Sequence, residues 1–465
     1  MHAFFKFRGL ILYMLLLMLC RNPLPAQAHL SGEVFLDLET GLFRCKLTLS
    51  QLPQLEHYQI LLNKGMNIKY FRDQEGQLLP YEGYYGGKMR GGALQYSFVN
   101  EEEEKIPLPS TFSVEYLGAF PRYVDSLNTF DYNGFISINA QTLRAAAQTV
   151  WYPQLYDESQ DRIFDLFTYD LSLKVNKETM LFVNGSIPKK AKSAHFSSEK
   201  ARPLLLFIGD YEVITSNGNY LLNLGVDAHT AELVMKSMDE VKGVLSEILK
   251  RPFTHDPIFL INHQDVDWEA GRVWAFNQYP ALVFSGLDFA TVLNEQGQLP
   301  PPLIKGFGHE FAHNFFGLDV FRGELAWFWL ESFPEYLSFE VAEHLCPPGY
   351  VNSLLLKMAS SLQEASFVPL PQIEKAEEIN EAYRYVMGPL ILKCFADTFG
   401  KANMHSVLRK LLKYAEIQPL SLDLWKQAAM ESGIDPAAFE EFYAQYVADP
   451  KFKEHVWEFI NKKYE

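Results

Sequence analysis

The sequence has few cysteines, and none of them lies at a spacing that binds metals or forms a redox centre. Four cysteines occur in 465 residues, and no C-x-x-C motif is among them. Cys20 lies in an N-terminal segment that we expect to be removed. The others, Cys45, Cys346 and Cys394, permit at most one disulfide, and Cys346 with Cys394 is the pair closer in sequence. A disulfide-rich scaffold and a cysteine-based zinc site are therefore not expected.

Basic residues are also scarce relative to acidic ones. The chain has 41 lysines and arginines against 57 aspartates and glutamates, a net charge of −16. Removing the three basic residues of the N-terminal segment leaves 38 against 57, a net charge of −19. This balance argues against nucleic acid or an anionic membrane surface as a partner. The sequence also has no internal repeat and no signal for an oligomeric state.

Long hydrophobic runs are absent apart from one short run near the N-terminus, Leu10–Cys20. Eleven residues are too few to cross a bilayer comfortably. Lys6 and Arg8 precede the run and Ala26-Gln27-Ala28 follows it, a pattern typical of a secretory signal peptide. We therefore predict that residues 1–28 are a signal, and that the protein is exported to the periplasm or outside the cell without stable membrane insertion. An uncleaved anchor is the alternative.

The rest of the composition is that of a globular protein with a substantial core. Hydrophobic residues make up 48%, aromatics 14% and charged residues 21% of the chain, whose length exceeds what one core usually supports. Residues 29–225 show short apolar or alternating runs broken by turn residues, which predicts strands. Residues 226–465 predict a second, α-rich domain.

The second domain mixes a few strands with many helices. Ala228–Lys250 has apolar residues at helical spacing, and Pro257–Asn262 and Ala281–Ser285 read as strands. We expect Pro300–Pro302 to be a linker and almost everything from Leu303 onward to be helical.

Residues 309–313 read H-E-F-A-H and are the clearest candidate for chemistry. On a helix, residues four apart share a face, so His309 and His313 can present two imidazoles to one ion while Glu310 lies beside them. The alternative is a metal-free helix that buries two histidines in the core.

A carboxylate that can complete a metal site follows on a second predicted helix. Glu331 lies eighteen positions after His313, and Glu324 and Glu335 compete with it. Two histidines and one carboxylate, with a fourth position open, are the ligand set of a catalytic zinc ion.

These segments resemble the aminopeptidase-N-type gluzincin zinc metallopeptidases. The family pattern is H-E-x-x-H, eighteen residues, and a glutamate within W-L-N-E-G-F-A-S-Y. Residues 329–336 read W-L-E-S-F-P-E-Y, which matches the tryptophan, leucine and glutamate with a spacer of seventeen. The resemblance implies one Zn²⁺ per chain, held by His309, His313 and Glu331. For Glu335 it leaves two interpretations: a hydrogen bond to a ligand histidine, or a plain surface acid.

The resemblance extends over nearly the whole mature chain. Residues 385–392, Y-V-M-G-P-L-I-L, are similar to the family segment Y-x-K-G-x-x-x-L, which implies that the Tyr385 hydroxyl stabilises the tetrahedral intermediate. Residues 151–153 and 207–211 look like landmarks of the family's N-terminal domain. The implied fold is α+β: an N-terminal antiparallel β-sandwich or saddle, then a thermolysin-like, mostly helical catalytic domain. We expect the C-terminal helical-repeat domain of longer relatives to be missing.

One segment departs from the family pattern in a way that affects substrate class. Family exopeptidases carry G-A-M-E-N on an edge strand, and its glutamate pairs with the free α-amine of the substrate. Residues 274–278 read W-A-F-N-Q, so that Ala275, Phe276, Asn277 and Gln278 are the expected substrate-lining residues. Asn277 replaces the glutamate and supplies no charge, which weakens recognition of an ammonium group. Glu269 is an alternative partner for the amine, and backbone pairing of a peptide with the strand is unaffected.

The sequence therefore predicts zinc-dependent hydrolysis of peptide bonds in a peptide or protein substrate. Glu310 would take a proton from water activated by the metal, and Tyr385 would stabilise the charge that develops on the carbonyl oxygen. Two alternatives stay open: a zinc-containing peptide-binding protein with weak or no catalysis, and an endopeptidase or oligopeptidase.

Overall fold

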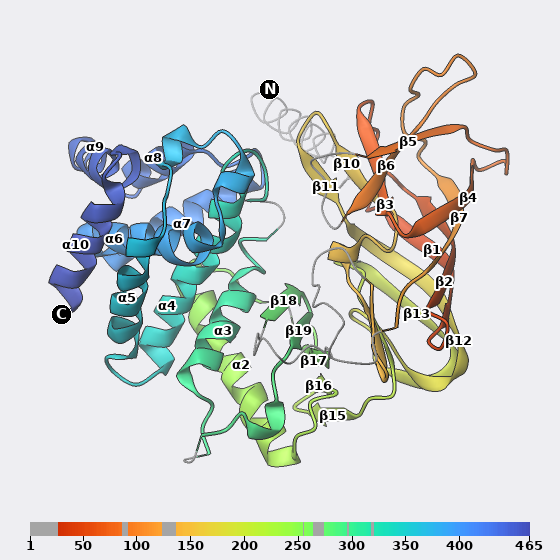
Figure 1. The fold of residues 1–465 in the computed structure, drawn as a ribbon, viewed down its shortest axis with the longest axis horizontal. Coiled ribbons are helices and arrows are strands. Elements are labelled where there is room, and N and C mark those ends of the chain that lie inside the picture. The colour runs from red at the N-terminus through yellow and green to blue at the C-terminus, as the bar shows by residue number, and fades with distance from the viewer. Residues whose placement is uncertain are drawn as a thin grey trace, which may run out of the picture. The chain divides into compact units, whose positions relative to one another are not determined.

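The structure is a computed structural model that describes residues 27–85, 92–122, 136–253, 255–263, 274–294, 297–317 and 320–465. The predicted α+β class is confirmed, with β-sheets in the N-terminal part and mostly helices in the C-terminal part (Figure 1). The chain divides into two compact units, Met1–Asp210 and Tyr211–Glu465. Residues 1–26, which hold most of the predicted signal peptide, and Glu269 lie outside the described residues.

The division between the units falls before the predicted boundary near residue 225. Strands β15 (Val213–Ser216) and β16 (Asn219–Leu222) form a hairpin whose turn, Asn217-Gly218, has positive φ at both residues. Strand β16 then pairs in parallel with a strand of the second unit. The hairpin therefore belongs to the second unit, although its sequence reads like the strands before it.

The first unit contains a sheet with nine strands among the described residues. The pairing is antiparallel except between β1 and β12, which are parallel. Burial alternates along the strands, as Phe112, Val114 and Tyr116 show, so one face packs inward and the other meets solvent. In spatial order the strands are β4 (Met66–Arg72), β7 (Phe112–Ala119), β2 (Leu42–Ser50), β1 (His29–Asp37), β12 (Leu166–Val183), β14 (Leu206–Gly209), β9 (Thr142–Ala145) and β8 (Ser137–Ile138), with β13 (Lys189–Pro203) paired to β12.

A second, five-stranded sheet packs on the first and makes the unit a sandwich. Its described strands are, in spatial order, β11 (Arg162–Phe164), β10 (Gln154–Asp157), β3 (Tyr58–Asn63), β6 (Ala93–Phe98) and β5 (Tyr81–Tyr85). The ring of Phe98 lies between the sheets, with centroids 5.1 Å from Phe71 and 5.2 Å from Phe112. Trp151 is fully buried in this core, and its indole nitrogen donates to the carbonyl of Leu204.

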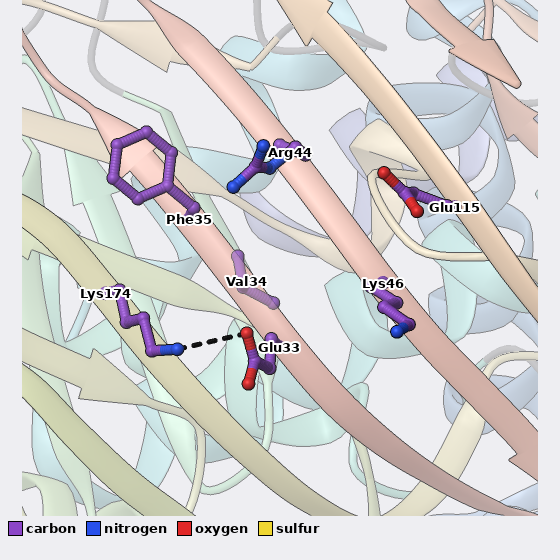
Figure 2. A pocket seen from close by; sticks show the side chains of 7 residues that line it. All are labelled: Glu33, Val34, Phe35, Arg44, Lys46, Glu115 and Lys174. Atoms are coloured by element: carbon purple, nitrogen blue, oxygen red, sulfur yellow. Dashed lines mark hydrogen bonds and ion pairs between the residues drawn. The ribbon is translucent and has the colours of Figure 1, made fainter. Parts of the chain in front are cut away.

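The solvent face of the nine-stranded sheet has a shallow pocket lined by charged side chains (Figure 2). Lys174 pairs with Glu33 at 3.0 Å, and the guanidinium of Arg44 lies over the ring of Phe35. Charges of both signs neutralise one another here in contact with water, which is typical of a solvated sheet face. The lining residues are Glu33, Val34, Phe35, Arg44, Lys46, Glu115 and Lys174.

The second unit begins with a five-stranded sheet in the order β15, β16, β17 (Phe259–His263), β19 (Ala281–Ser285) and β18 (Trp274–Gln278). Strands β16, β17 and β19 are parallel, whereas β18 is antiparallel to β19. Among the described strands, β18 lies at the edge of this sheet.

Helices form most of the second unit. The α-helices are α2 (Ala228–Leu249), α3 (Pro301–Ala312), α4 (Phe333–Leu345), α5 (Tyr350–Ser361), α6 (Gly388–Phe399), α7 (Lys401–Ala415), α8 (Leu422–Glu431), α9 (Pro436–Tyr443) and α10 (Phe452–Tyr464). Three π-turns are described, η4 (Phe328–Ser332), η8 (Tyr383–Met387) and η9 (Ala444–Ala448). Short 3₁₀ turns are η1 (Ala147–Thr149), η2 (Phe289–Thr291), η5 (Leu362–Glu364), η6 (Leu370–Gln372) and η7 (Ala376–Glu378). In the part of the chain that the structure describes, no helix has the length and apolarity needed to span a membrane.

Two expectations about this unit are corrected or resolved. Pro300–Pro302 is not a linker, because Pro301 and Pro302 form the first turn of α3. Proline suits that turn, since its fixed φ is helical and its missing N–H would have no partner there. Cys346 and Cys394 are free thiols and do not form the disulfide that their spacing allows.

Candidate metal centre

Helix α3 carries both histidines at its C-terminal end. Leu303, Phe307 and Phe311 follow one another at helical spacing and bury one side of the helix. His309 and His313 lie on another face, and their Nε2 atoms are 3.1 Å apart. Although α3 ends at Ala312, the backbone of His313 keeps helical angles, so the two imidazoles stay on one face.

Gly308 lets helix α4 approach α3 closely beside these histidines. A Cβ atom at Gly308 would lie 3.1 Å from the Cβ of Val341 and 3.2 Å from the Cα of Ser338. These distances are shorter than an ordinary carbon contact of about 3.5–4.0 Å. A side chain here would make the neighbouring groups of α4 shift by a few tenths of an ångström. The close crossing brings Glu331 of the turn η4 and Glu335 of α4 next to the histidines.

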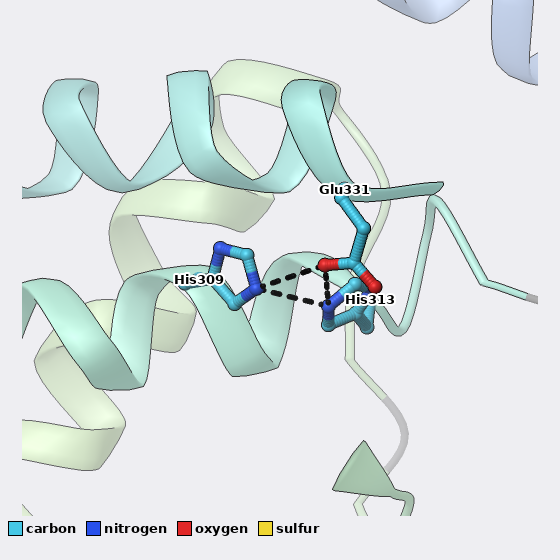
Figure 3. Close-up of side chains that lie close together, drawn as sticks. All are labelled: His309, His313 and Glu331. Carbon is cyan, nitrogen blue, oxygen red and sulfur yellow. Dashed lines mark hydrogen bonds and ion pairs between the residues drawn. The ribbon is translucent and has the colours of Figure 1, made fainter. Parts of the chain in front are cut away.

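Glu331, in the turn η4, completes a cluster of three ligand atoms (Figure 3). Its Oε2 lies 3.4 Å from Nε2 of His309 and 3.5 Å from Nε2 of His313. Ligands about 2.0–2.1 Å from a zinc ion in a tetrahedron lie about 3.3 Å from one another. The three residues thus have the chemistry and the spacing to hold zinc and to leave a fourth position open.

A hydrogen bond on the outer ring nitrogen orients each histidine. Nδ1 of His309 donates to Oε2 of Glu335 at 2.9 Å, and Nδ1 of His313 donates to the carbonyl of Phe316 at 3.2 Å. A carboxylate and a carbonyl only accept, so each Nδ1 carries a proton and Nε2 is the nitrogen that faces the metal position. Lys305 lies 2.5 Å from the other oxygen of Glu335.

Lys305 is a site residue that the sequence analysis missed. It lies on α3, four positions before His309, and forms a chain of contacts with Glu335 and His309 in which the Glu335 carboxylate is buried. Lys305 is four positions from His309, a spacing that places both side chains on one face of a helix and could have identified it. Its partner Glu335, however, is thirty positions away on α4.

The buried charges shift the pKa values of these groups. Burial alone would lower the pKa of His309, but hydrogen bonds to Glu331 and Glu335 outweigh it and raise the pKa to about 10. Burial would raise the pKa of Glu335, yet Lys305 and His309 hold it at about 2. The histidines likewise hold the pKa of Glu331 well below its usual range. Without metal, His309 is therefore a cation between two carboxylates at neutral pH.

Glu310 follows the first ligand and has a different environment. It is buried, and burial raises the pKa of its carboxyl group above the ordinary value. Its Oε2 has no hydrogen-bond partner among the described residues. A carboxylate oxygen without a partner, beside a metal position, is suited to exchange a proton with a bound molecule.

Tyr385, in the turn η8, lies beside His309. Its ring centroid is 5.8 Å from that of His309, and 39% of the residue is exposed. Burial of the hydroxyl and the nearby charges of Glu331 and Glu310 raise its pKa. The hydroxyl therefore stays protonated at neutral pH and can donate a hydrogen bond.

Of the predicted substrate-lining residues, Asn277 contacts helix α3 directly. Its Nδ2 donates to the backbone carbonyl of Glu310 at 2.6 Å, and its Oδ1 is buried without a partner among the described residues. Phe276 is buried and stacks on Trp274. Ala275 is half-buried and Gln278 is buried, in the same strand β18.

The two other candidates for the third ligand lie elsewhere. Glu324 is exposed in the turn before η4, and Glu335 contacts the outer nitrogen of His309. Glu331 is the carboxylate that meets both Nε2 atoms, despite the spacer of seventeen residues.

Comparison with known proteins gives structural but no sequence matches. No family model matches the chain, and no curated protein matches its sequence. An M1 zinc metallopeptidase from Deinococcus radiodurans superposes with a TM-score of 0.60 at 14% identity, over 91% of this chain and 95% of that one. A mutant of that enzyme bound to a Tyr-Ser-Ala substrate gives the same TM-score over 90% of this chain and 94% of that one, again at 14% identity.

A more distant neighbour is yeast LTA4 hydrolase, with a TM-score of 0.55 at 11% identity, over 94% of this chain and 67% of that one. At these identities the likeness establishes the fold. The chain therefore has the fold of the M1 zinc metallopeptidases across nearly its whole length.

Replacement of the third ligand tests the metal centre. Glu331→Gln should weaken zinc affinity by more than about 100-fold, because loss of a direct ligand exceeds the 10–100-fold cost of losing an outer hydrogen bond. Glu324→Gln, a matched change at an exposed position, should leave affinity within about twofold. Chelator competition measures both, and equal effects would contradict the assignment.

The pKa of His309 predicts how zinc affinity depends on pH. Zinc must displace the Nε2 proton of His309, whose pKa in the metal-free site is about 10. Below that pH, each unit of acidification should weaken apparent affinity about tenfold for this one proton. Titrations between about pH 6 and 9 should also show proton release into a weak buffer. An affinity independent of pH in this range would contradict the electrostatic account.

Proposed function

We propose that this protein is a zinc-dependent metallopeptidase that hydrolyses peptide bonds in peptides, with one Zn²⁺ per chain. The observation that carries the proposal is the triangle of ligand atoms, 3.1 to 3.5 Å apart, with the carboxylate of Glu310 and the ring of Tyr385 beside it. The M1 neighbour bound to a Tyr-Ser-Ala substrate supports peptides as the substrate class.

Glu310 is the residue that moves the proton. Zinc, when held by His309, His313 and Glu331, supplies a Lewis acid that polarises the peptide carbonyl and makes water more acidic. Glu310 accepts the proton of the attacking water and delivers it to the leaving amine. A carboxyl group whose pKa is raised by burial is better matched to both steps than an exposed one.

Tyr385 stabilises the charge that develops on the carbonyl oxygen. Its hydroxyl remains protonated because its pKa is raised, so it donates a hydrogen bond throughout the neutral range. A donor aimed at a developing oxyanion in a partly buried site is typically worth about 10²–10³-fold in rate.

Strand β18 binds the substrate backbone and Asn277 faces its N-terminus. An extended peptide can pair with the edge strand β18 through main-chain hydrogen bonds. Because Nδ2 of Asn277 is engaged by the Glu310 carbonyl, Oδ1 is the atom left to accept from an amine. A neutral acceptor binds an ammonium less tightly than a carboxylate does, so recognition of a free N-terminus is reduced.

The uncharged Asn277 also favours a second candidate within the same chemistry, an endopeptidase or oligopeptidase that does not require a free N-terminus. A zinc-containing peptide-binding protein is the non-catalytic alternative, and Glu310 argues against it, since a binder has no use for a proton-accepting carboxylate. The N-terminal segment leads us to propose export to the periplasm or outside the cell, followed by signal removal.

Glu310→Gln separates catalysis from metal binding. The amide cannot accept the proton, so kcat should fall by at least about 10²–10⁴-fold while zinc affinity stays within about threefold. Peptide cleavage is followed by mass spectrometry and zinc by elemental analysis. Equal zinc and equal cleavage in the variant and the wild type would show that Glu310 is not the base.

Asn277 variants test amine recognition. Wild type should hydrolyse a free peptide and its N-acetylated form with kcat/KM values within about tenfold of each other, because position 277 has no negative charge to stabilise the bound ammonium group. Asn277→Glu should increase the preference for the free peptide by roughly tenfold, the difference between a neutral and a charge-assisted hydrogen bond.

Asn277→Gln is the control of equal size and should leave that preference unchanged. A wild type that cleaves only free N-termini would contradict reduced recognition, and Glu269 would then be the residue to replace next.

A further inference from the structure

We infer that Ser332 is a positioning residue for the proposed peptidase: its hydroxyl fixes the turn that holds the metal ligand Glu331 against the turn that holds Tyr385. Only the expected effect of Ser332 on turnover rests on the proposed function. Its structural part concerns two chain segments that lie 52 positions apart at their point of contact.

Both segments are π-turns, and one hydrogen bond joins them. Oγ of Ser332, the last residue of η4, donates to the carbonyl of Arg384 in η8 at 3.0 Å. Ser332 directly follows Glu331, and Arg384 directly precedes Tyr385. The bond therefore links the immediate neighbours of a ligand and of the oxyanion-stabilising tyrosine. A π-turn places one more residue in the turn than an α-helix, and such turns are frequent at functional sites.

The two turns also meet without space between them. A Cβ atom at Gly388, the first residue of α6 after η8, would lie 2.1 Å from Oγ and 2.6 Å from Cβ of Ser332. Gly388 has ordinary helical angles, so glycine is favoured here by the contact and not by the backbone conformation. Ser332 itself is fully buried.

Arg384 reinforces the same junction with its side chain. Its guanidinium carbon lies 3.6 Å from the centroid of Trp327, the residue that caps η4, and its Nε donates to the carbonyl of Ile379. Both the main chain and the side chain of Arg384 thus hold η8 against η4.

The serine is a feature of this chain and not of the motif that it resembles. In W-L-N-E-G-F the residue after the ligand glutamate is glycine, which has no side chain to donate a hydrogen bond. Here the serine follows Glu331 at the end of a spacer that is one residue shorter. The hydroxyl supplies a contact between the two turns that the glycine of the pattern cannot make.

Displacement of a catalytic group by about 1 Å can cost about 100-fold in rate. Removal of one hydrogen bond that restrains two such groups should therefore affect turnover more than substrate binding. Ser332→Ala should lower kcat by about tenfold with KM within about twofold. It should weaken zinc affinity by about three- to tenfold, less than loss of a ligand, because Glu331 remains but is less well aimed.

Thr149→Val is the control, since Thr149 is equally buried and its hydroxyl bonds to the carbonyl of Ala146 in the first unit, outside the metal centre. It should change stability without changing kcat or zinc affinity. The comparison uses zinc-loaded full-length protein, with kcat, KM, zinc affinity and urea unfolding measured for each variant. If Ser332→Ala changes stability alone, as Thr149→Val is expected to do, the positioning role is overturned.

If no peptidase activity is found, zinc affinity and urea unfolding still test the positioning role of Ser332. An inactive wild type whose zinc affinity still falls on Ser332→Ala contradicts the proposed function but supports the positioning of Glu331. The contact itself is tested by Gly388→Ala, whose destabilisation should be reduced by about half or more in a Ser332→Gly background. Additive effects of the two substitutions would show that the turns do not meet as described.

Discussion

The close crossing of α3 and α4 at Gly308 is the constraint on which the metal centre depends. Helix α3 supplies His309, Glu310 and His313, whereas the turn before α4 supplies Glu331 and α4 itself supplies Glu335. A Cβ atom at position 308 would lie 3.1 to 3.2 Å from Val341 and Ser338, so the contact would have to widen by a few tenths of an ångström. The ligand triangle has sides of 3.1 to 3.5 Å, and the two sides that reach Glu331 join α3 to the turn before α4.

The charge of the site explains why its geometry suits a divalent cation. Three carboxylates, Glu310, Glu331 and Glu335, are buried close to the histidines, and Lys305 balances one of them. Buried charge is costly unless it is paired. Two negative charges therefore remain, which a divalent ion between neutral imidazoles neutralises. In the metal-free protein the pKa values of His309 and Glu310 are raised, so protons bound to these two residues neutralise the same negative charges.

Local patterns in the sequence were enough to find part of this site. Residues His309, Glu310 and His313 follow from a spacing of four on a helix, because that periodicity is a local property of the chain. Glu331 needed the resemblance to a family motif, since spacing alone left Glu324 and Glu335 as competitors. The class of fold was predicted correctly from the change of period near residue 225, but the hairpin β15–β16 reads like the strands before it and joins the later sheet.

The contacts that sequence reasoning missed are those between distant segments. Lys305 meets Glu335 thirty positions away and Ser332 meets Arg384 52 positions away, and each contact depends on how two elements cross. The parallel pairing of β1 with β12 is of the same kind, because strand patterns predict strands but not their partners. Such contacts orient the ligands and the tyrosine. Local sequence patterns therefore identify which residues form the site, but not the contacts that fix their positions.

The most direct test of the central claim is a titration of zinc into the metal-free protein, with bound metal and peptide cleavage followed together. The account predicts that both rise in proportion and level off at one zinc per chain. Zinc that binds at one equivalent without cleavage of any peptide would make the protein a metal-containing binder. Cleavage that persists without zinc would show that the chemistry does not come from this site.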